Sequence, residues 1–205
     1  MLTAIDLTLW RGTTCLFDGL SFEVADGCAL LVRGPNGSGK TTLLRVLCGL
    51  TRPETGRVEW NGTAVEHDRQ GFGAQLAYIG HAMGLKADLT VAQNLAFVAR
   101  MNGRDERSWE RYLEPLNLRR CADLEVRYLS AGQQRRAALA RMLMSDARLW
   151  CMDEPFTNLD AAGRQFIGSQ IRTRVEAGGT AIVAAHHDLD IGPVPLDTIY
   201  LGATG

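Results

Sequence analysis

The chain has 205 residues, of which 46% are hydrophobic and 22% charged, and its formal net charge is −1. This composition is typical of a globular domain, and the small charge argues against a general nucleic-acid binder, which usually has a strongly basic face. No apolar run reaches the roughly 18–20 residues that span a bilayer. The N-terminus also lacks the basic start and apolar core of a signal peptide, so we expect a cytoplasmic protein that reaches a membrane only through a partner.

The first part of the chain predicts three strands. Residues 2–9 alternate loosely between apolar and polar side chains and predict an edge strand. Residues 16–24 alternate more regularly and predict a second strand, after which Asp26 and Gly27 form a turn. Residues 29–32 are a short apolar run, which predicts a buried strand.

A glycine-rich loop follows this buried strand and fits the phosphate-loop pattern G-x-x-x-x-G-K-[ST] at every fixed position. Its glycines can aim backbone N–H groups at a phosphate, and the helix expected over 42–48 adds the positive end of its dipole. Lys40 supplies a positive charge for the β- and γ-phosphates, and Thr41 a hydroxyl for the Mg²⁺ that bridges them. The predicted nucleotide contacts are Gly34, Pro35, Asn36, Gly37, Ser38, Gly39, Lys40, Thr41 and Thr42.

The rest of the chain alternates between predicted strands and helices. This order favours an α/β fold with a largely parallel sheet, whose ligands sit at the carboxyl ends of the strands. Asp153 and Glu154 end one buried strand, and His186 and His187 follow another, so we expect both pairs beside the phosphate loop. The expected strands cover residues 56–60, 76–79, 147–154, 180–185 and 198–201, and the expected helices lie within 90–145 and 161–175.

A second candidate phosphate site lies at the start of the helix that follows residue 130. Ser130 is a favourable N-cap, and the small residues Ala131 and Gly132 leave the helix start open to an anion. Taken alone, this segment is better explained as an ordinary helix cap than as a phosphate site. The phosphate loop upstream and the Asp153-Glu154 pair downstream favour the functional interpretation.

In order and spacing, these motifs resemble those of the nucleotide-binding subunits of ABC transporters over nearly the whole chain. Residues 34–42 match the family's Walker A loop and 149–153 its Walker B strand. Residues 129–133 match the signature motif, with Ala131 where glycine is most usual, and 157–160 match the D-loop.

The resemblance implies a P-loop NTPase fold, with a mostly parallel core sheet, an antiparallel N-terminal β part and an inserted helical lobe. Residues 1–205 would form a single ATP-binding domain. Its ATP-binding core would comprise 1–83 and 146–205, and a helical subdomain over 84–145 would end in the signature motif and its helix.

The family mechanism implies that two copies pair head to tail around two ATP molecules. Lys40 of one copy would hold the γ-phosphate that Ser130 and Gly132 of the other copy contact, and Asp160 would lie at the seam between them. Two-fold symmetry would make the two sites equivalent.

The same mechanism implies catalytic roles at the strand ends. Glu154 would orient or deprotonate the attacking water, and Asp153 would hold Mg²⁺ together with Thr41. One histidine would contact the γ-phosphate, and His186, at the end of its apolar strand, is favoured over His187.

Two positions depart from the family pattern. His81 stands where a glutamine usually couples the nucleotide to the membrane partner, and we carry it over as a candidate coupling residue. Arg11, beside Trp10, stands where an aromatic side chain usually stacks on adenine, although a guanidinium can also stack on a base.

A narrower resemblance rests on Tyr78-Ile79-Gly80-His81, the signature motif and the short length. These are similar to the ATP-binding subunits of the bacterial haem exporter for cytochrome c maturation. The resemblance implies haem export or haem-chaperone release at the cytoplasmic face of the inner membrane. The implied partners are an integral membrane permease (CcmB-like) and other cytochrome c maturation proteins, and no nucleic acid. The alternatives are the ATPase of a lipid or drug exporter and, less in keeping with a single cassette, a soluble ABC ATPase acting on DNA or ribosomes.

Overall fold

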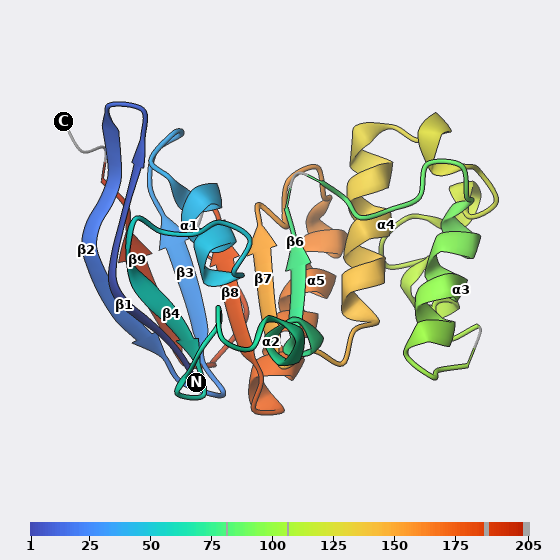
Figure 1. Ribbon diagram of the computed structural model, residues 1–205. Helices are drawn as coiled ribbons and strands as arrows, with labels where there is room; N and C mark the ends of the chain where they lie inside the picture. The colour runs from blue at the N-terminus through green and yellow to red at the C-terminus, as the bar shows by residue number, and fades with distance from the viewer. Residues whose placement is uncertain (81, 106, 187–188, 203–205) are drawn as a thin grey trace.

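The computed structural model describes residues 1–80, 82–105, 107–186 and 189–202. Two sheets stand side by side, and a helical lobe extends from the end of the second sheet (Figure 1). The first sheet is antiparallel and has the strand order β2-β1-β4-β5. Its strands are β1 (Leu2–Arg11), β2 (Thr14–Val24), β4 (Thr55–Trp60) and β5 (Thr63–Ala64).

Strand β1 lies inside this sheet, so the expectation of an edge strand over residues 2–9 is wrong. It pairs with β2 on one side and with β4 on the other. The register with β2 shifts at several points along β1, and Asp6 has a φ of 50°. These irregularities break the two-residue period, which explains why the apolar residues of β1 alternate only loosely.

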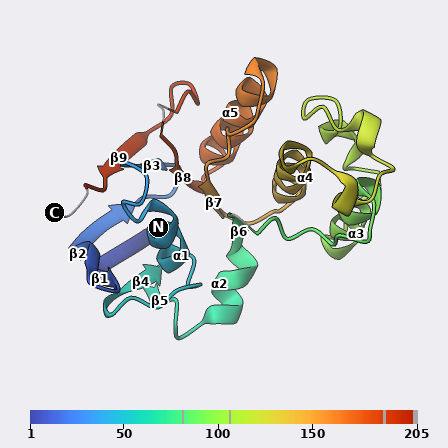
Figure 2. The same cartoon turned by 90° about the horizontal axis from the view of Figure 1, so that it is seen from above.

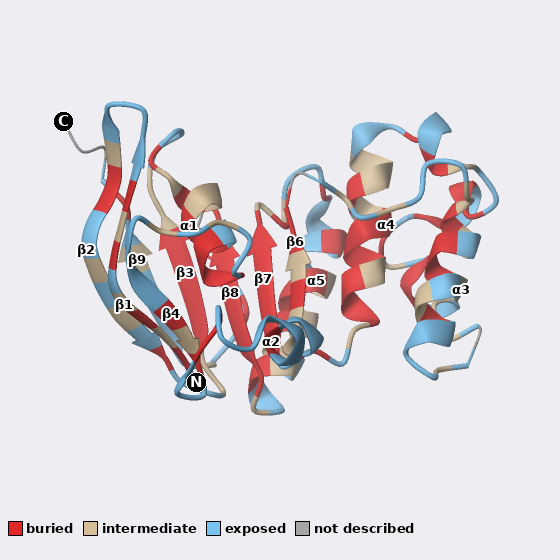
Figure 3. Ribbon diagram, in the orientation of Figure 1, coloured by how far each residue is buried: buried red, intermediate tan, exposed pale blue. Residues whose placement is uncertain are grey.

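The second sheet is parallel throughout, with the strand order β6-β7-β8-β3-β9. Strands β3, β7 and β8 are buried along their length (Figure 3). Helices cover both faces, with α1 on one and α5 on the other (Figure 2), so the strands need apolar side chains on both sides. The elements are β3 (Ala29–Arg33), β6 (Leu76–Ile79), β7 (Leu149–Asp153), β8 (Thr180–Ala184), β9 (Leu196–Tyr200), α1 (Lys40–Leu47) and α5 (Ala161–Glu176).

Helix α1 is packed into the cluster that joins the two sheets. Leu43, Leu44 and Leu47 are fully buried and share this cluster with Leu7 of β1 and Val32 of β3. The helix that follows the phosphate loop is therefore held from both sides. The expected α/β fold, with its parallel core and antiparallel N-terminal sheet, is confirmed.

The lobe contains α3 (Val91–Met101), three short 3₁₀ turns and α4 (Ala131–Leu143). Within the described residues of 84–145 there is no strand, only an isolated bridge between Thr90 and Glu125. Leu95 of α3, Leu139 of α4 and Ile167 of α5 belong to one buried cluster, so apolar packing continues from the lobe to the core. The division at residues 83–84 and 145–146 stays a prediction.

The sequence did not predict one of the helices, α2 (Arg69–Gln75). It contains Gly71 and Gly73, which disfavour helix in an unfolded chain. Asp68 compensates, because its side chain accepts a hydrogen bond from the N–H of Gly71 at 2.9 Å. Across the described residues, every helix is too short or too polar to cross a membrane.

The lobe packing predicts a stability difference within α3. Replacing the fully buried Leu95 by alanine leaves a cavity and should lower the free energy of unfolding by about 3 kcal/mol. Met101→Ala, at a side chain that is 71% exposed on the same helix, should change it by less than about 0.5 kcal/mol. Urea denaturation of both variants measures this, and equal losses would contradict the packing described.

Candidate nucleotide site

The phosphate loop connects the end of β3 to the start of α1 and needs glycine at two of its positions. Gly34 has a φ of 149°, and a Cβ there would lie 2.3 Å from the carbonyl oxygen of Leu201. Gly39, the N-cap of α1, has a φ of 93°, and its Cβ would lie 3.1 Å from Cβ of Leu16. Gly34 is therefore required by close packing as well as by backbone conformation, and Gly39 by its backbone conformation.

The loop gathers polar groups around its inner side. The ammonium of Lys40 donates to the carbonyls of Gly34 at 2.8 Å and Pro35 at 2.9 Å, so its charge lies within the loop. The hydroxyl of Ser38 is buried and has no hydrogen-bond partner among the described residues. A buried hydroxyl of this kind fits an anionic ligand that would accept its hydrogen. Asn36 and Gly37 are exposed at the tip, and Thr41 and Thr42 lie half-buried in the first turn of α1.

The end of β7 meets the start of α1 through one hydrogen bond. The hydroxyl of Thr41 donates to Oδ2 of Asp153 at 2.8 Å. Asp153 is only 4% exposed. A hydroxyl and a carboxylate are hard oxygen donors, the type that Mg²⁺ prefers, and their contact fits the pair of metal ligands predicted from the sequence.

Glu154 follows Asp153 in an uncommon backbone conformation. Its φ is 51°, a region that glutamate seldom adopts, and its N–H donates to the carbonyl of Ala184 at 2.8 Å. Oε1 of Glu154 lies 3.1 Å from Nε2 of His186, close enough for an ion pair when the imidazole is protonated. The structure thus brings Glu154 and His186 together at the strand ends. His187 and His81 lie outside the described residues.

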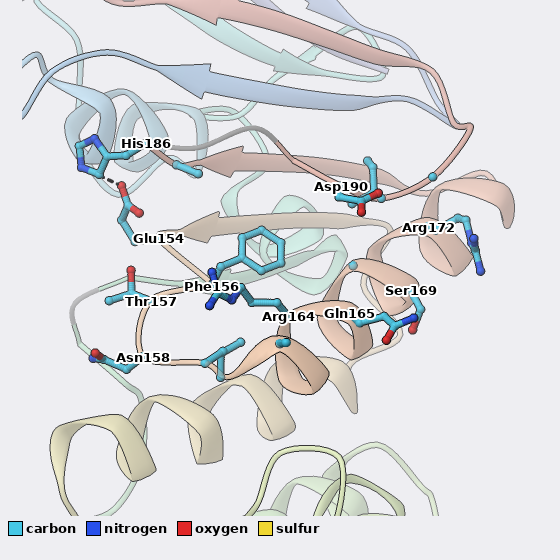
Figure 4. Close-up of a pocket in the computed structure, with 16 residues that line it drawn as sticks. Glu154, Phe156, Thr157, Asn158, Arg164, Gln165, Ser169, Arg172, His186 and Asp190 are labelled. Carbon is cyan, nitrogen blue, oxygen red and sulfur yellow. Dashed lines mark ion pairs between the residues drawn. The ribbon is translucent and has the colours of Figure 1, made fainter.

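A groove of about 850 Å³ extends from this pair along α5. Figure 4 shows Glu154 and His186 pointing toward each other at one end, with Asp190 and Arg172 at the other. Asp160 is the N-cap of α5, and its side chain accepts from the N–H of Gly163 at 2.8 Å. The predicted D-loop therefore borders the groove and is fixed by this cap.

The signature segment lies apart from the phosphate loop of the same chain. Ser130 caps α4 in a capping box with Gln133, and Ser130 and Ala131 are exposed, whereas Gly132 is half-buried. Helix α4 lies on the far side of β6 from α1 in both views (Figures 1 and 2). One chain alone does not bring Ser130 to Lys40.

The candidate base contact, Arg11, is exposed at the end of β1, where it pairs with Thr14. Trp10 beside it is 46% exposed. Since Leu16 of β2 touches the Gly39 position, this hairpin borders the phosphate loop. An exposed guanidinium and an indole thus lie where a nucleotide base could reach them.

Arg135 is a buried cation that was not singled out from the sequence. It is 7% exposed and donates to the carbonyl of Gly80 at 2.6 Å and to the carbonyl of Asp153. Burial lowers its pKa, while the negative charge of Asp153 opposes that shift. The sequence holds no signal that singles it out, because Arg135 lies in a run of polar residues over 133–136 near the start of α4.

Comparisons with known proteins agree with this geometry. The family model described as ABC transporter matches residues 17–157. The "Cytochrome c biogenesis ATP-binding export protein CcmA" of Methylococcus capsulatus is 42% identical over 93% of this chain and 93% of its own. The protein of the same name from Tatumella citrea is 44% identical over 92% of this chain and 90% of its own length.

The solved structures show the same fold. A structure titled "Dimeric structure of a post-hydrolysis state of the ATP-binding cassette MJ0796 bound to ADP and Pi" superposes with a TM-score of 0.80 at 22% identity. It covers 100% of this chain and 97% of its own. The structure titled "Putative ABC transporter (ATP-binding protein) from Pyrococcus furiosus" superposes with a TM-score of 0.79 at 21% identity. The match covers 98% of this chain and 96% of the other chain.

The packing of Tyr78 predicts a pH dependence of stability. Burial first, and then the charge of Asp153, raises the pKa of Tyr78 from 10.0 to about 12. Because the unfolded phenol ionises first, the stability linked to Tyr78 is complete below about pH 10 and is lost as the pH approaches 12. Urea midpoints at pH 9 and pH 11 should therefore fall less for Tyr78→Phe than for the parent.

The matched control for this experiment is Tyr200→Phe, which removes a phenol that is 70% exposed. It should show the same fall between the two pH values as the parent. A Tyr78→Phe variant that falls as far as the parent would contradict the assignment.

Proposed function

The chain belongs to the ABC transporter family and, within it, to the cytochrome c biogenesis ATP-binding export proteins, and we propose that it is the subunit whose ATP hydrolysis drives a membrane transporter. The hydrogen bond between Thr41 and Asp153 carries the proposal. It joins the phosphate loop to the strand that ends in Asp153, directly before Glu154, which is the arrangement that phosphoryl transfer to water requires.

In this proposal each polar group has one task. The backbone N–H groups of the loop and Lys40 bind the β- and γ-phosphates, and Ser38 donates its unpaired hydroxyl. Thr41 and Asp153 would hold Mg²⁺, which supplies positive charge against the phosphate oxygens. Glu154 accepts the proton of the attacking water, and its backbone contact to β8 keeps the carboxylate at the sheet edge.

His186 is proposed to contact the γ-phosphate. Its distance of 3.1 Å to Glu154 lets one imidazole orient the carboxylate as well. This contact supports His186 for the role, and His187 lies outside the described residues.

A second copy of the chain is proposed to complete each site. The exposed start of α4, with Ser130 and Gly132, would contact the γ-phosphate held by Lys40 of the other copy. The separation of α4 from α1 within one chain supports this arrangement (Figure 1). Asp160, at the cap of α5, would then lie at the seam. ATP would hold the two copies together, and hydrolysis would release them.

The relatives' names support a role in export during cytochrome c biogenesis. The proposed task within it is export of haem or release of a haem chaperone. The proposed partners are an integral membrane CcmB-like permease and other maturation proteins at the cytoplasmic face of the inner membrane. Phe97 and Met101, 48% and 71% exposed on α3, offer apolar surface for such a partner. His81 remains the candidate coupling residue.

Glu154→Gln tests the hydrolytic role. The amide keeps the shape of the side chain but cannot accept the proton, so kcat for ATP should fall by about 10²- to 10⁴-fold. ATP should still bind and should stabilise a dimer that size-exclusion chromatography detects. Glu110→Gln, at an exposed carboxylate of the lobe, should match the parent. Parent-level turnover by Glu154→Gln would remove Glu154 from this role.

Purification from membranes tests the transport role. The tagged chain, extracted in mild detergent, should bring with it a polytopic permease and cytochrome c maturation proteins, identified by mass spectrometry. A lipid or drug permease in their place would keep the ATPase and reject the haem assignment. Recovery with ribosomes or DNA and no membrane protein would reject the transport role.

A further inference from the structure

Arg135 connects the signature helix to the edge of the sheet where Asp153 and Glu154 lie. Its Nη1 donates to the carbonyl of Gly80 at 2.6 Å, just after β6, and its Nη2 donates to the carbonyl of Asp153 at the end of β7. The guanidinium thus spans two neighbouring parallel strands from a helix of the lobe. A planar fork with several N–H donors suits this task, because two carbonyls can be bound at once.

The contact to Asp153 fixes a single peptide group from both of its ends. The carbonyl of Asp153 and the N–H of Glu154 belong to the same planar unit. Arg135 binds the carbonyl, and the carbonyl of Ala184 in β8 accepts from the N–H at 2.8 Å. This peptide joins the proposed metal carboxylate to the proposed catalytic carboxylate, so its orientation sets the direction of both side chains.

The backbone at this point would not hold its conformation unaided. Glu154 has a φ of 51°, which is costly for a residue with a side chain and persists only when its surroundings enforce it. The two hydrogen bonds on the preceding peptide supply that enforcement. One of them comes from α4, whose N-cap is Ser130 and whose first turn contains Gly132.

We propose that Arg135 is a positioning residue for ATP hydrolysis, which holds the Asp153–Glu154 peptide in its working orientation and couples that orientation to the signature helix. The proposal rests on the hydrolytic function proposed above. Arg135 touches neither nucleotide nor metal in this scheme. Its loss should misplace the two carboxylates while leaving the phosphate loop intact.

Arg141 provides a matched control for a purely structural role. It lies on the same helix, it is half-buried, and burial lowers the pKa of its guanidinium as it does for Arg135. Its guanidinium lies near Gly84 and makes no hydrogen bond to Asp153 among the described contacts. Replacing either arginine by methionine removes a positive charge from α4, but only Arg135→Met frees the peptide.

The experiment compares the parent, Arg135→Met, Arg135→Lys and Arg141→Met in one assay series. Nucleotide affinity is measured with ATP in EDTA and with ATP in Mg²⁺, alongside kcat, KM and the thermal midpoint. Arg135→Met should lower kcat by about 10- to 100-fold and reduce the gain in affinity that Mg²⁺ gives, with ATP affinity in EDTA unchanged. Arg135→Lys should recover part of the lost kcat and part of the lost Mg²⁺ effect on affinity. Arg141→Met should keep the parent's kcat and the parent's Mg²⁺ effect.

The proposal is overturned if Arg135→Met keeps both the parent's kcat and the parent's increase in ATP affinity with Mg²⁺. It is also overturned if Arg141→Met lowers these two quantities as much as Arg135→Met does. It is also overturned if affinity in EDTA falls together with the thermal midpoint in Arg135→Met and Arg135→Lys, because the role is then structural. A parent that binds Mg-ATP without hydrolysing it would count against the proposed function alone. The Mg²⁺ gain in affinity would still decide the role of Arg135.

Discussion

A hydrogen bond between residues 112 positions apart in sequence, from Thr41 to Asp153, holds the site together. It can form because β3 and β7 run in the same direction on either side of β8, so the loop after β3 and the end of β7 emerge at one edge. The burial of α1 between the two sheets keeps Thr41 at that edge. The parallel topology, rather than any local preference, therefore creates the site.

Local chemistry made part of this architecture predictable. The phosphate loop, the buried strands and the Ser130 cap depend on neighbours within a few residues, so their sequences specify them. The interior position of β1 depends on pairing with β4, more than 40 residues away, and its bulges hid the strand period. Helix α2 was missed because its two glycines outweigh, in sequence, a cap that becomes visible only once the chain is folded.

Within the site too, residues of local motifs could be predicted from the sequence, whereas residues defined by distant contacts could not. Lys40 and Thr41 belong to a contiguous motif, whereas the importance of Arg135 comes from carbonyls 18 and 55 positions away. Every residue has a backbone carbonyl, so no pattern of residue types identifies a contact to a main-chain acceptor. Arg135 is one of four successive polar residues over 133–136, so neither its burial nor its partners can be read from the sequence.

The capping box at Ser130 limits which side chains can serve there. A hydroxyl has one hydrogen to give and two lone pairs that accept. The cap uses a lone pair, since Oγ accepts from the N–H of Gln133 at 3.3 Å. The hydrogen is left for an outside acceptor such as a phosphate oxygen. Aspartate would cap the helix equally well but has no proton to offer at neutral pH and would repel an anion. Helix stability and anion recognition thus place separate demands on this position, and a hydroxyl meets both through a single atom.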